Sequence, residues 1–162
     1  MIHGLLIDQF ALSTRMRNCR WNVTGPQELR WLFASHDRLL GETLDNIAGR
    51  ARTVGEIRTA TLARFLNRAR AKAHPGEPPR ASEITSELRV GHETVICRLR
   101  ENLDRCTSTS GEMITRDFLN GLIEQHEKMA AELQGVEGES HQRRANRRAQ
   151  RPEAPLTACV ST

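Results

Sequence analysis

Apolar residues recur at steps of three and four along most of this 162-residue chain, and that spacing places them on one side of an α-helix. Four segments carry the pattern: one up to about residue 21, then about 27–54, 82–106 and 112–133. Signals for strands are few, because tyrosine is absent and β-branched residues are scattered. The sequence therefore predicts an all-α fold built from four amphipathic helices.

The connections between these segments predict how the helices are joined. Thr24-Gly25-Pro26 breaks the first helix, and Gly55 ends the second. Residues 56–80 form a long connection with a short helical patch, which contains Leu62, Phe65, Leu66 and Ala69. Short loops make neighbouring helices antiparallel, whereas a long crossover allows the second and third helices to run in parallel. We therefore expect a ferritin-like four-helix bundle with a short helix in the crossover; the alternative is a four-helix bundle with different wiring.

Length and composition limit the number of domains and the cellular compartment that we expect for this chain. The length suits one domain, which we place at residues 1–135. No stretch approaches the roughly 18 uninterrupted apolar residues of a membrane span, and no cleavage site typical of a secretory signal follows the N-terminus. The four cysteines form no CxxC pair, which indicates reduced thiols. We expect a cytoplasmic protein without a membrane partner.

The basic excess of the chain is concentrated at its C-terminal end. Residues 143–162 carry five arginines and one acid, which accounts for the whole net charge of +4 and leaves residues 1–142 formally neutral. Residues 136–162 lack helical periodicity, so we predict a disordered, arginine-rich tail there. Arginines neutralise phosphates whatever the base sequence, so the tail predicts non-specific binding to DNA; a merely solubilising tail is the alternative. The arginines are Arg143, Arg144, Arg147, Arg148 and Arg151.

Several segments, in the same order along the chain, resemble the Dps family, the DNA-binding proteins from starved cells. Residues 17–26 (RNCRWNVTGP) are similar to the family's R-N-x-H-W-N-V-x-G-P run, except at the histidine. Residues 44–50 (LDNIAGR) resemble its I-D-E-I-A-E-R segment, and residues 125–128 (QHEK) are similar to part of its fourth helix. The resemblance covers about residues 2–134. It implies a ferritin-like miniferritin that forms a hollow homododecamer, binds DNA in the nucleoid and serves in stress response and iron storage.

The resemblance also implies a ferroxidase site between two subunits, with two His and one Asp from one subunit and an Asp and a Glu from its neighbour. Matched position by position, the two histidines correspond to Arg20 and Arg30, and the first Asp to Ala34. The neighbour's acids correspond to Asp45 and Gly49, so one expected ligand of five is retained. A guanidinium has no lone pair for a metal. We therefore expect a degenerate site, with iron binding doubtful and ferroxidase activity lost or reduced.

Two hypotheses follow for this interface. In the first, Arg20 or Arg30 fills the space of the iron and pairs with Asp45 across the dimer interface, beside Trp21. In the second, a displaced iron site uses Asp45 with Asp37 and His36. The competing interpretation is that His36 and Asp37 are ordinary surface or interface polar groups.

The leading functional interpretation is a Dps-like DNA-binding and DNA-protection protein that forms a cage and binds DNA through its basic tail. The alternative is a working miniferritin that oxidises Fe(II) with peroxide at a rewired intersubunit site and stores the ferric product. A third possibility is a subunit that assembles together with a ferroxidase-competent paralogue.

Overall fold

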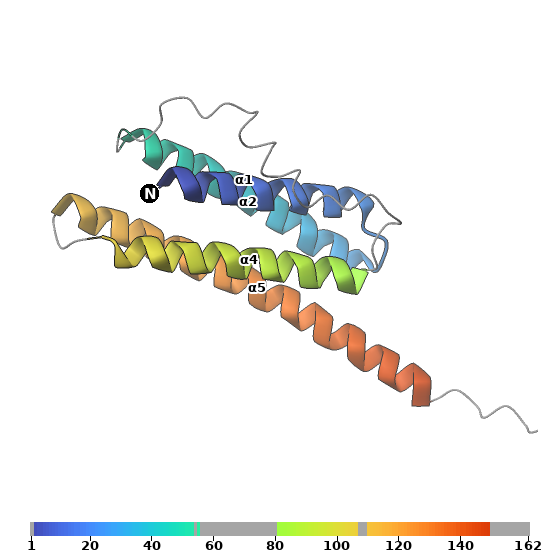
Figure 1. The fold of residues 1–162 in the computed structure, drawn as a ribbon. Helices are drawn as coiled ribbons and strands as arrows, with labels where there is room; N and C mark the ends of the chain where they lie inside the picture. The colour runs from blue at the N-terminus through green and yellow to red at the C-terminus, as the bar shows by residue number, and fades with distance from the viewer. Residues whose placement is uncertain (1, 54, 56–80, 107–109, 150–162) are drawn as a thin grey trace, which may run out of the picture.

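Four long helices contain nearly all the residues that the computed structural model describes, namely residues 2–53, 55, 81–106 and 110–149 (Figure 1). The helices are α1 (Ile2–Asn22), α2 (Gln27–Thr53), α4 (Ala81–Asp104) and α5 (Ser110–Ala149). The predicted all-α class is confirmed, and the first three helices begin and end close to the expected residues. The short helix expected in the crossover lies outside the described residues.

The four helices pack as two antiparallel hairpins. Figure 1 shows α1 running against α2 and α4 running against α5, while α2 and α4 run in the same direction. Helix α1 packs on α2 and α4, and α5 packs on α4 and α2, so each helix has two neighbours and one diagonal partner. A short loop cannot join two parallel helices of this length. The arrangement therefore confirms the ferritin-like wiring predicted from the long connection.

Local chain chemistry fixes the ends of the first hairpin. The backbone N–H of Val23 donates to the carbonyl of Cys19 at 2.8 Å as α1 ends, and α2 begins directly after Pro26, a residue suited to a helix start. After α2, Gly55 takes a positive φ of 73° and its N–H donates to the carbonyl of Arg52 at 3.1 Å. Only glycine adopts that conformation without steric cost, so Gly55 stops the helix as the sequence predicted.

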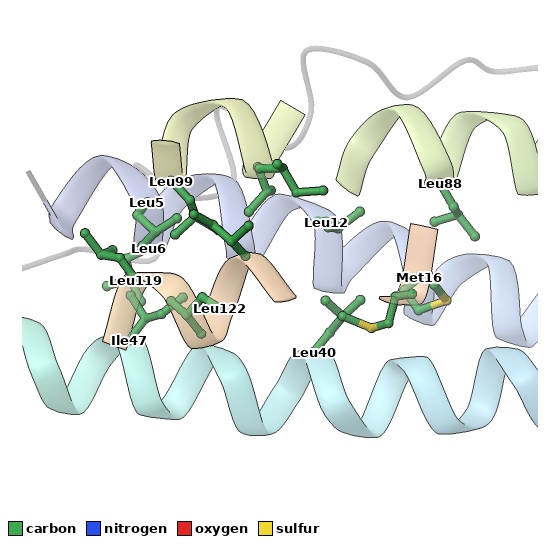
Figure 2. Close-up of a cluster of buried hydrophobic side chains, with 14 of the residues drawn as sticks. Leu5, Leu6, Leu12, Met16, Leu40, Ile47, Leu88, Leu99, Leu119 and Leu122 are labelled. Carbon is green, nitrogen blue, oxygen red and sulfur yellow. The ribbon is translucent and has the colours of Figure 1, made fainter. Parts of the chain in front are cut away.

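The core lies along the axis of the bundle and draws side chains from all four helices (Figure 2). Each helix contributes apolar positions three and four residues apart, as amphipathic packing requires. No helix in the described part of the chain combines the length and apolar character needed to cross a membrane. The fully buried members, with at most 1% of their surface exposed, include Leu5, Met16, Phe33, Leu40, Ile47, Leu88, Leu99, Leu119, Met129 and Leu133.

Polar contacts join α2 to α5 along the seam between the hairpins. The hydroxyl of Thr43 donates to Gln125 Oε1 at 3.0 Å, and Arg50 donates to the hydroxyl of Thr115 at 2.7 Å. A third contact joins His36 to Glu132 and belongs to a buried histidine cluster described below. Directional hydrogen bonds spaced along a seam fix the register of two helices, which apolar packing alone specifies less strictly.

Helix α5 continues beyond the core, and here the structure differs from the sequence expectation. Leu133 is the last fully buried residue among those whose burial the structure describes, yet the helix runs on to Ala149 and projects past the other helices (Figure 1). Residues 136–149, expected to be disordered, are therefore helical. Their sequence is rich in helix-forming Glu, Gln, Arg and Ala, and the first proline beyond them is Pro152. A helix surrounded by solvent needs no apolar stripe, so periodicity could not reveal it.

Candidate functional site

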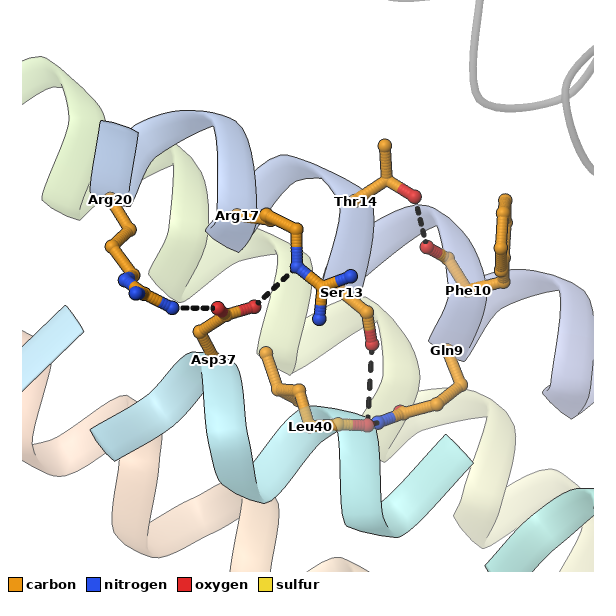
Figure 3. Close-up of polar contacts among 8 residues, drawn as sticks. All are labelled: Gln9, Phe10, Ser13, Thr14, Arg17, Arg20, Asp37 and Leu40. Carbon is orange, nitrogen blue, oxygen red and sulfur yellow. Dashed lines mark hydrogen bonds and ion pairs between the residues drawn. The ribbon is translucent and has the colours of Figure 1, made fainter. Parts of the chain in front are cut away.

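Asp37 of α2 is held by two arginines of α1 (Figure 3). Arg17 Nε donates to Asp37 Oδ1 at 3.1 Å, and Arg20 Nη1 donates to Asp37 Oδ2 at 2.6 Å. The carboxylate is 4% exposed, whereas the two arginine side chains are about half exposed, at 52% and 47%. The arginines lie three residues apart, which places them one turn apart on one face of α1. Both oxygens of Asp37 are thus engaged by cations.

This contact also shows what Arg20 does at the position matched to the first family histidine. Its guanidinium neutralises an acid of its own chain and directs a permanent positive charge to the place where a neutral imidazole would be needed. Asp37 in turn carries a charge-assisted hydrogen bond on each oxygen, and two adjacent cations disfavour the approach of a metal ion to it. The residues at this position do not fit an iron ligand set.

The other positions matched to the family's ferroxidase site lie on the outer side of α2. Arg30 is exposed and donates to the carbonyl of Gly25 at 3.1 Å, within the turn between α1 and α2. Asp45 is exposed, and Ala34 and Gly49 are half-buried. Helical spacing puts Ala34, Asp45 and Gly49 on the side of α2 opposite core residues such as Leu40 and Ile47, and it puts Arg30 about a quarter turn from that core side. An outer face is where a site shared with a second subunit has to be.

Two tryptophans are exposed near the same end of the hairpin. Trp21 lies next to the last residue of α1 and is 68% exposed, and Trp31 lies in the second turn of α2 and is 64% exposed. Large apolar side chains that are exposed in the single chain indicate a contact surface. Trp21 was singled out from the sequence, but Trp31 was missed; its position one residue after Arg30, on the outer side of α2, is the signal that marks it.

The structure does not bring together the residues of the proposed displaced iron site. Asp37 faces α1, His36 is fully buried, and Asp45 is exposed about 12 Å further along α2. Within the described ranges, no group of three or more His, Cys, Asp or Glu side chains is already arranged to hold a metal ion. Of the interpretation of His36 and Asp37 as ordinary surface or interface polar groups, the surface part is wrong, since both are buried in the single chain.

Three histidines from three helices meet in the interior of the bundle. They are His36 of α2, His92 of α4 and His126 of α5, and none has any exposed surface. The two Nδ1 atoms of His92 and His126 lie 3.0 Å apart, and the rings have their centroids 5.1 Å apart. The rings of His36 and His92 stand edge to face, with centroids 6.1 Å apart. His36 Nε2 lies 2.7 Å from Glu132 Oε2.

Burial decides the protonation state of this cluster. It lowers the pKa of His92 to about 2, helped by the neighbouring His126 and His36, and it lowers the pKa of His126 to about 4. Burial also lowers the pKa of His36, although its hydrogen bond to Glu132 acts in the opposite direction. All three imidazoles are therefore neutral at pH 7, and each keeps one nitrogen lone pair.

The sequence pointed to His36 only as a possible ligand of a displaced iron site, so the cluster of His36 with His92 and His126 was missed. The available signal was the spacing of each histidine from core residues. His92 lies four residues after Leu88 and seven before Leu99, and His126 lies four residues after Leu122. Each histidine thus occupies a core position of its helix, but the sequence alone does not state that the three core positions share one level of the bundle.

The structure describes the backbone at four of the five arginines of the predicted DNA-binding tail. Arg143, Arg144, Arg147 and Arg148 lie in the last turns of α5, and Arg151 lies outside the described residues. Arg144, Arg147 and Arg148 lie one, four and five residues after Arg143, and these spacings put all four positions on one side of a helix. The basic segment therefore has a helical backbone over most of its length.

We predict that Asp37→Asn destabilises the fold by about 1–3 kcal/mol, because it leaves two guanidiniums facing an uncharged amide. The matched control is Glu42→Gln, which breaks the exposed Arg38–Glu42 pair of 2.8 Å and is expected to cost less than about 0.5 kcal/mol. Urea unfolding of both variants measures the difference. Equal stabilities would contradict a structural role for the contact.

The histidine cluster predicts loss of stability in acid. The unfolded chain protonates each histidine near pH 6.5, whereas the folded chain does so only near pH 2 for His92 and pH 4 for His126. Stability is therefore complete above about pH 6.5 and falls as the pH drops below it, by about 2 kcal/mol for each of these histidines at pH 5. Urea unfolding at pH 7.5 and pH 5 in metal-free buffer tests this. The double variant His92→Leu/His126→Leu should lose markedly less stability between these two conditions; an unchanged loss would refute the assignment.

Comparison with known proteins agrees with this fold. No family model matches the chain. The chain is 36% identical over 137 residues to an uncharacterized low temperature-induced protein of Nostoc sp. and equally to its homologue in Anabaena variabilis; the match covers 83% of this chain and 76% of each relative. Among solved structures, a Dps variant from Listeria innocua superposes with a TM-score of 0.75 at 17% identity, over 85% of this chain and 91% of that one.

Two further structures extend the likeness. Dps from Listeria monocytogenes gives a TM-score of 0.72 at 19% identity, over 85% of this chain and 93% of that one. A variant of Dps1 from Mycobacterium smegmatis gives 0.66 at 19% identity, over 84% and 94%. The helix order, the parallel α2 and α4 and the motifs around residues 17–26 and 44–50 agree with these similarities. The chain therefore belongs to the family of the low temperature-induced proteins of Nostoc and Anabaena, and it has the ferritin-like fold of the Dps structures.

Proposed function

We propose that this protein is a DNA-binding and DNA-protection protein of the Dps type, assembled from copies of this chain into a cage, and that ferroxidase activity at its intersubunit position is lost or reduced. It acts in the cytoplasm, associated with the nucleoid, and the assembly is a dodecamer. The observation that carries the proposal is the contact of Arg20 with Asp37, because it puts a guanidinium where an iron ligand would be needed.

The charges around the intersubunit position support the loss of iron chemistry. Arg20 and Arg30 bring two permanent cations to the matched histidine positions, and Asp45 is the one acid retained among the five. Fe(II) binds imidazole and carboxylate ligands and is repelled by cations. Asp45 is exposed on the outer face of α2, so it is free to meet a cation of a second subunit. In this proposal an intersubunit ion pair takes the place of the metal bridge.

The exposed tryptophans support self-assembly. Trp21 and Trp31 lie on the hairpin that carries the matched positions, and more than half of each side chain is open in the single chain. Burying two tryptophans against a second copy would contribute several kcal/mol, at roughly 25 cal/mol for each Å² of apolar surface removed from water. The two subunits then pack outer face against outer face.

The C-terminal segment of α5 supports the DNA role. It projects beyond the core, and the body of the chain without it is formally neutral (Figure 1). Four arginine positions on one side of a helix form a stripe that follows phosphates, and such contacts carry no base preference. A single tail binds weakly, but a cage presents many tails to one DNA molecule, so avidity strengthens the complex.

The name of the two bacterial relatives adds a physiological context. They are described as low temperature-induced, and a protein that condenses and shields DNA is suited to a stress of that kind. Iron storage at a rewired intersubunit site, and assembly with a competent paralogue, are the competing functions. The proposal differs from the first of these because it requires no metal ligand set on the outer face of α2.

We expect truncation after Gln142 to abolish DNA binding in a gel-shift assay while leaving the fold intact, since the buried core that the structure describes ends at Leu133. Raising the salt from about 50 to about 200 mM should weaken the full-length complex about 100-fold if four phosphates are neutralised.

A matched pair of double variants separates the contribution of the tail to DNA binding from that of the positive charges on the body of the chain. Arg147→Gln/Arg148→Gln should weaken binding, whereas Arg52→Gln/Arg105→Gln, which removes two exposed arginines of the body, should leave binding nearly unchanged. Binding that survives truncation or does not depend on salt would refute the DNA role.

A further inference from the structure

We propose that His36, His92 and His126 form an intrasubunit binding site for a divalent transition-metal ion of the Zn²⁺ class, inside the bundle of a single chain. The three residues come from three helices and meet where no solvent reaches them. This inference is independent of the proposed function, because the cluster lies in the core and the intersubunit position lies on the outer face of α2.

The spacing of the first two histidines fits one shared ion. Their Nδ1 atoms are 3.0 Å apart. Two imidazole nitrogens bound to one Zn²⁺ at about 2.0–2.1 Å are separated by roughly 2.9–3.4 Å, depending on the angle at the metal. One Zn²⁺ can therefore bind both Nδ1 atoms at this separation when the proton between them moves to Nε2 of the same ring and both rings rotate to point their lone pairs at the ion.

His36 is prepared as the third ligand by its contact with Glu132. Its Nε2–H donates to the carboxylate at 2.7 Å, which leaves Nδ1 as the nitrogen with the lone pair. That Nδ1 is buried and has no hydrogen-bond partner among the described residues. A carboxylate that orients a histidine through its far nitrogen is the usual outer support of a metal-bound imidazole.

The ring positions show what movement the site requires. Imidazoles bound to one ion have their centroids roughly 5–6 Å apart, and the observed separations are 5.1 Å for His92–His126 and 6.1 Å for His36–His92. No three donor groups in the described chain already converge on one point, so binding requires rotation of the three imidazole rings toward the ion. Three ligands leave the fourth tetrahedral position for water.

The donor set selects the kind of ion. The three ligands are neutral nitrogens, and the carboxylate of Glu132 contacts a ligand histidine rather than the ion. Such a site suits Zn²⁺, Cu²⁺, Ni²⁺ or Fe²⁺ and does not suit Mg²⁺ or Ca²⁺, which need oxygen ligands. Burial keeps the pKa of His92 and His126 low, so both imidazoles are neutral at pH 7, and metal entry needs only the shift of one proton from Nδ1 to Nε2 within a ring. Glu132 supplies a negative charge next to the site.

The full-length protein, freed of metal, is titrated with Co²⁺ as an optical probe of nitrogen coordination and with Zn²⁺ in a thermal unfolding assay. We expect visible bands that saturate at one Co²⁺ per chain and a rise in Tm with Zn²⁺, because an ion that binds only the folded chain stabilises it. His92→Leu and His126→Leu should abolish both signals. Glu132→Gln should weaken binding about 10- to 100-fold by removing the support of His36.

Two controls separate this site from other ligands of the chain. Asp45→Asn tests the outer face of α2, and Cys97→Ser removes an exposed thiol; both should bind Co²⁺ as the parent does. X-ray absorption of the Zn²⁺-loaded parent protein should show three histidine nitrogens, a readout that needs no variant to fold. Absence of a stoichiometric ion, sulfur or oxygen ligation only, or binding that survives in folded His92→Leu and His126→Leu would overturn the proposal.

Discussion

A single carboxylate of α2, Asp37, accepts hydrogen bonds from two guanidiniums of α1, and the character of the outer face depends on that contact. The contact holds the Arg20 guanidinium in place and links α1 to α2 near the turn that joins them. It also disfavours Asp37 as a metal ligand. In the proposed function, the ferritin-like scaffold is kept while the ferroxidase activity implied by the resemblance is lost or reduced. Because a guanidinium does not lose its proton at any working pH, no change of conditions restores the ligand set.

Much of the fold was predictable because its determinants are local. The apolar spacing gave all four helices, Gly55 gave the end of α2, and the length of the connection after it gave the parallel direction of α2 and α4. The C-terminal part of α5 was not predictable in the same way. Residues beyond Leu133 form helix through backbone preference, whereas the periodic pattern reports only contact with a core.

The site was less predictable, since its contacts join residues far apart in the sequence. The sequence indicated that Arg20, Arg30, Ala34 and Gly49 do not form a ferroxidase site, because that conclusion needs only residue types. It did not indicate that Arg20 contacts Asp37, as both belong to different helices with many possible partners. Likewise, His36, His92 and His126 each lie at a core position, but which core positions meet is decided by how three helices are aligned. Two neighbouring residues of α2 thus belong to different polar clusters: Asp37 faces the arginines of α1, and His36 faces the histidines of α4 and α5.

Anomalous diffraction at the iron edge, recorded from crystals of the assembled protein soaked in Fe(II), tests the central claim most directly. We expect no iron within bonding distance of Asp45, and ordered density for the Arg20 guanidinium in contact with Asp37. An iron peak with Asp45 among its ligands, located between two subunits, would contradict it.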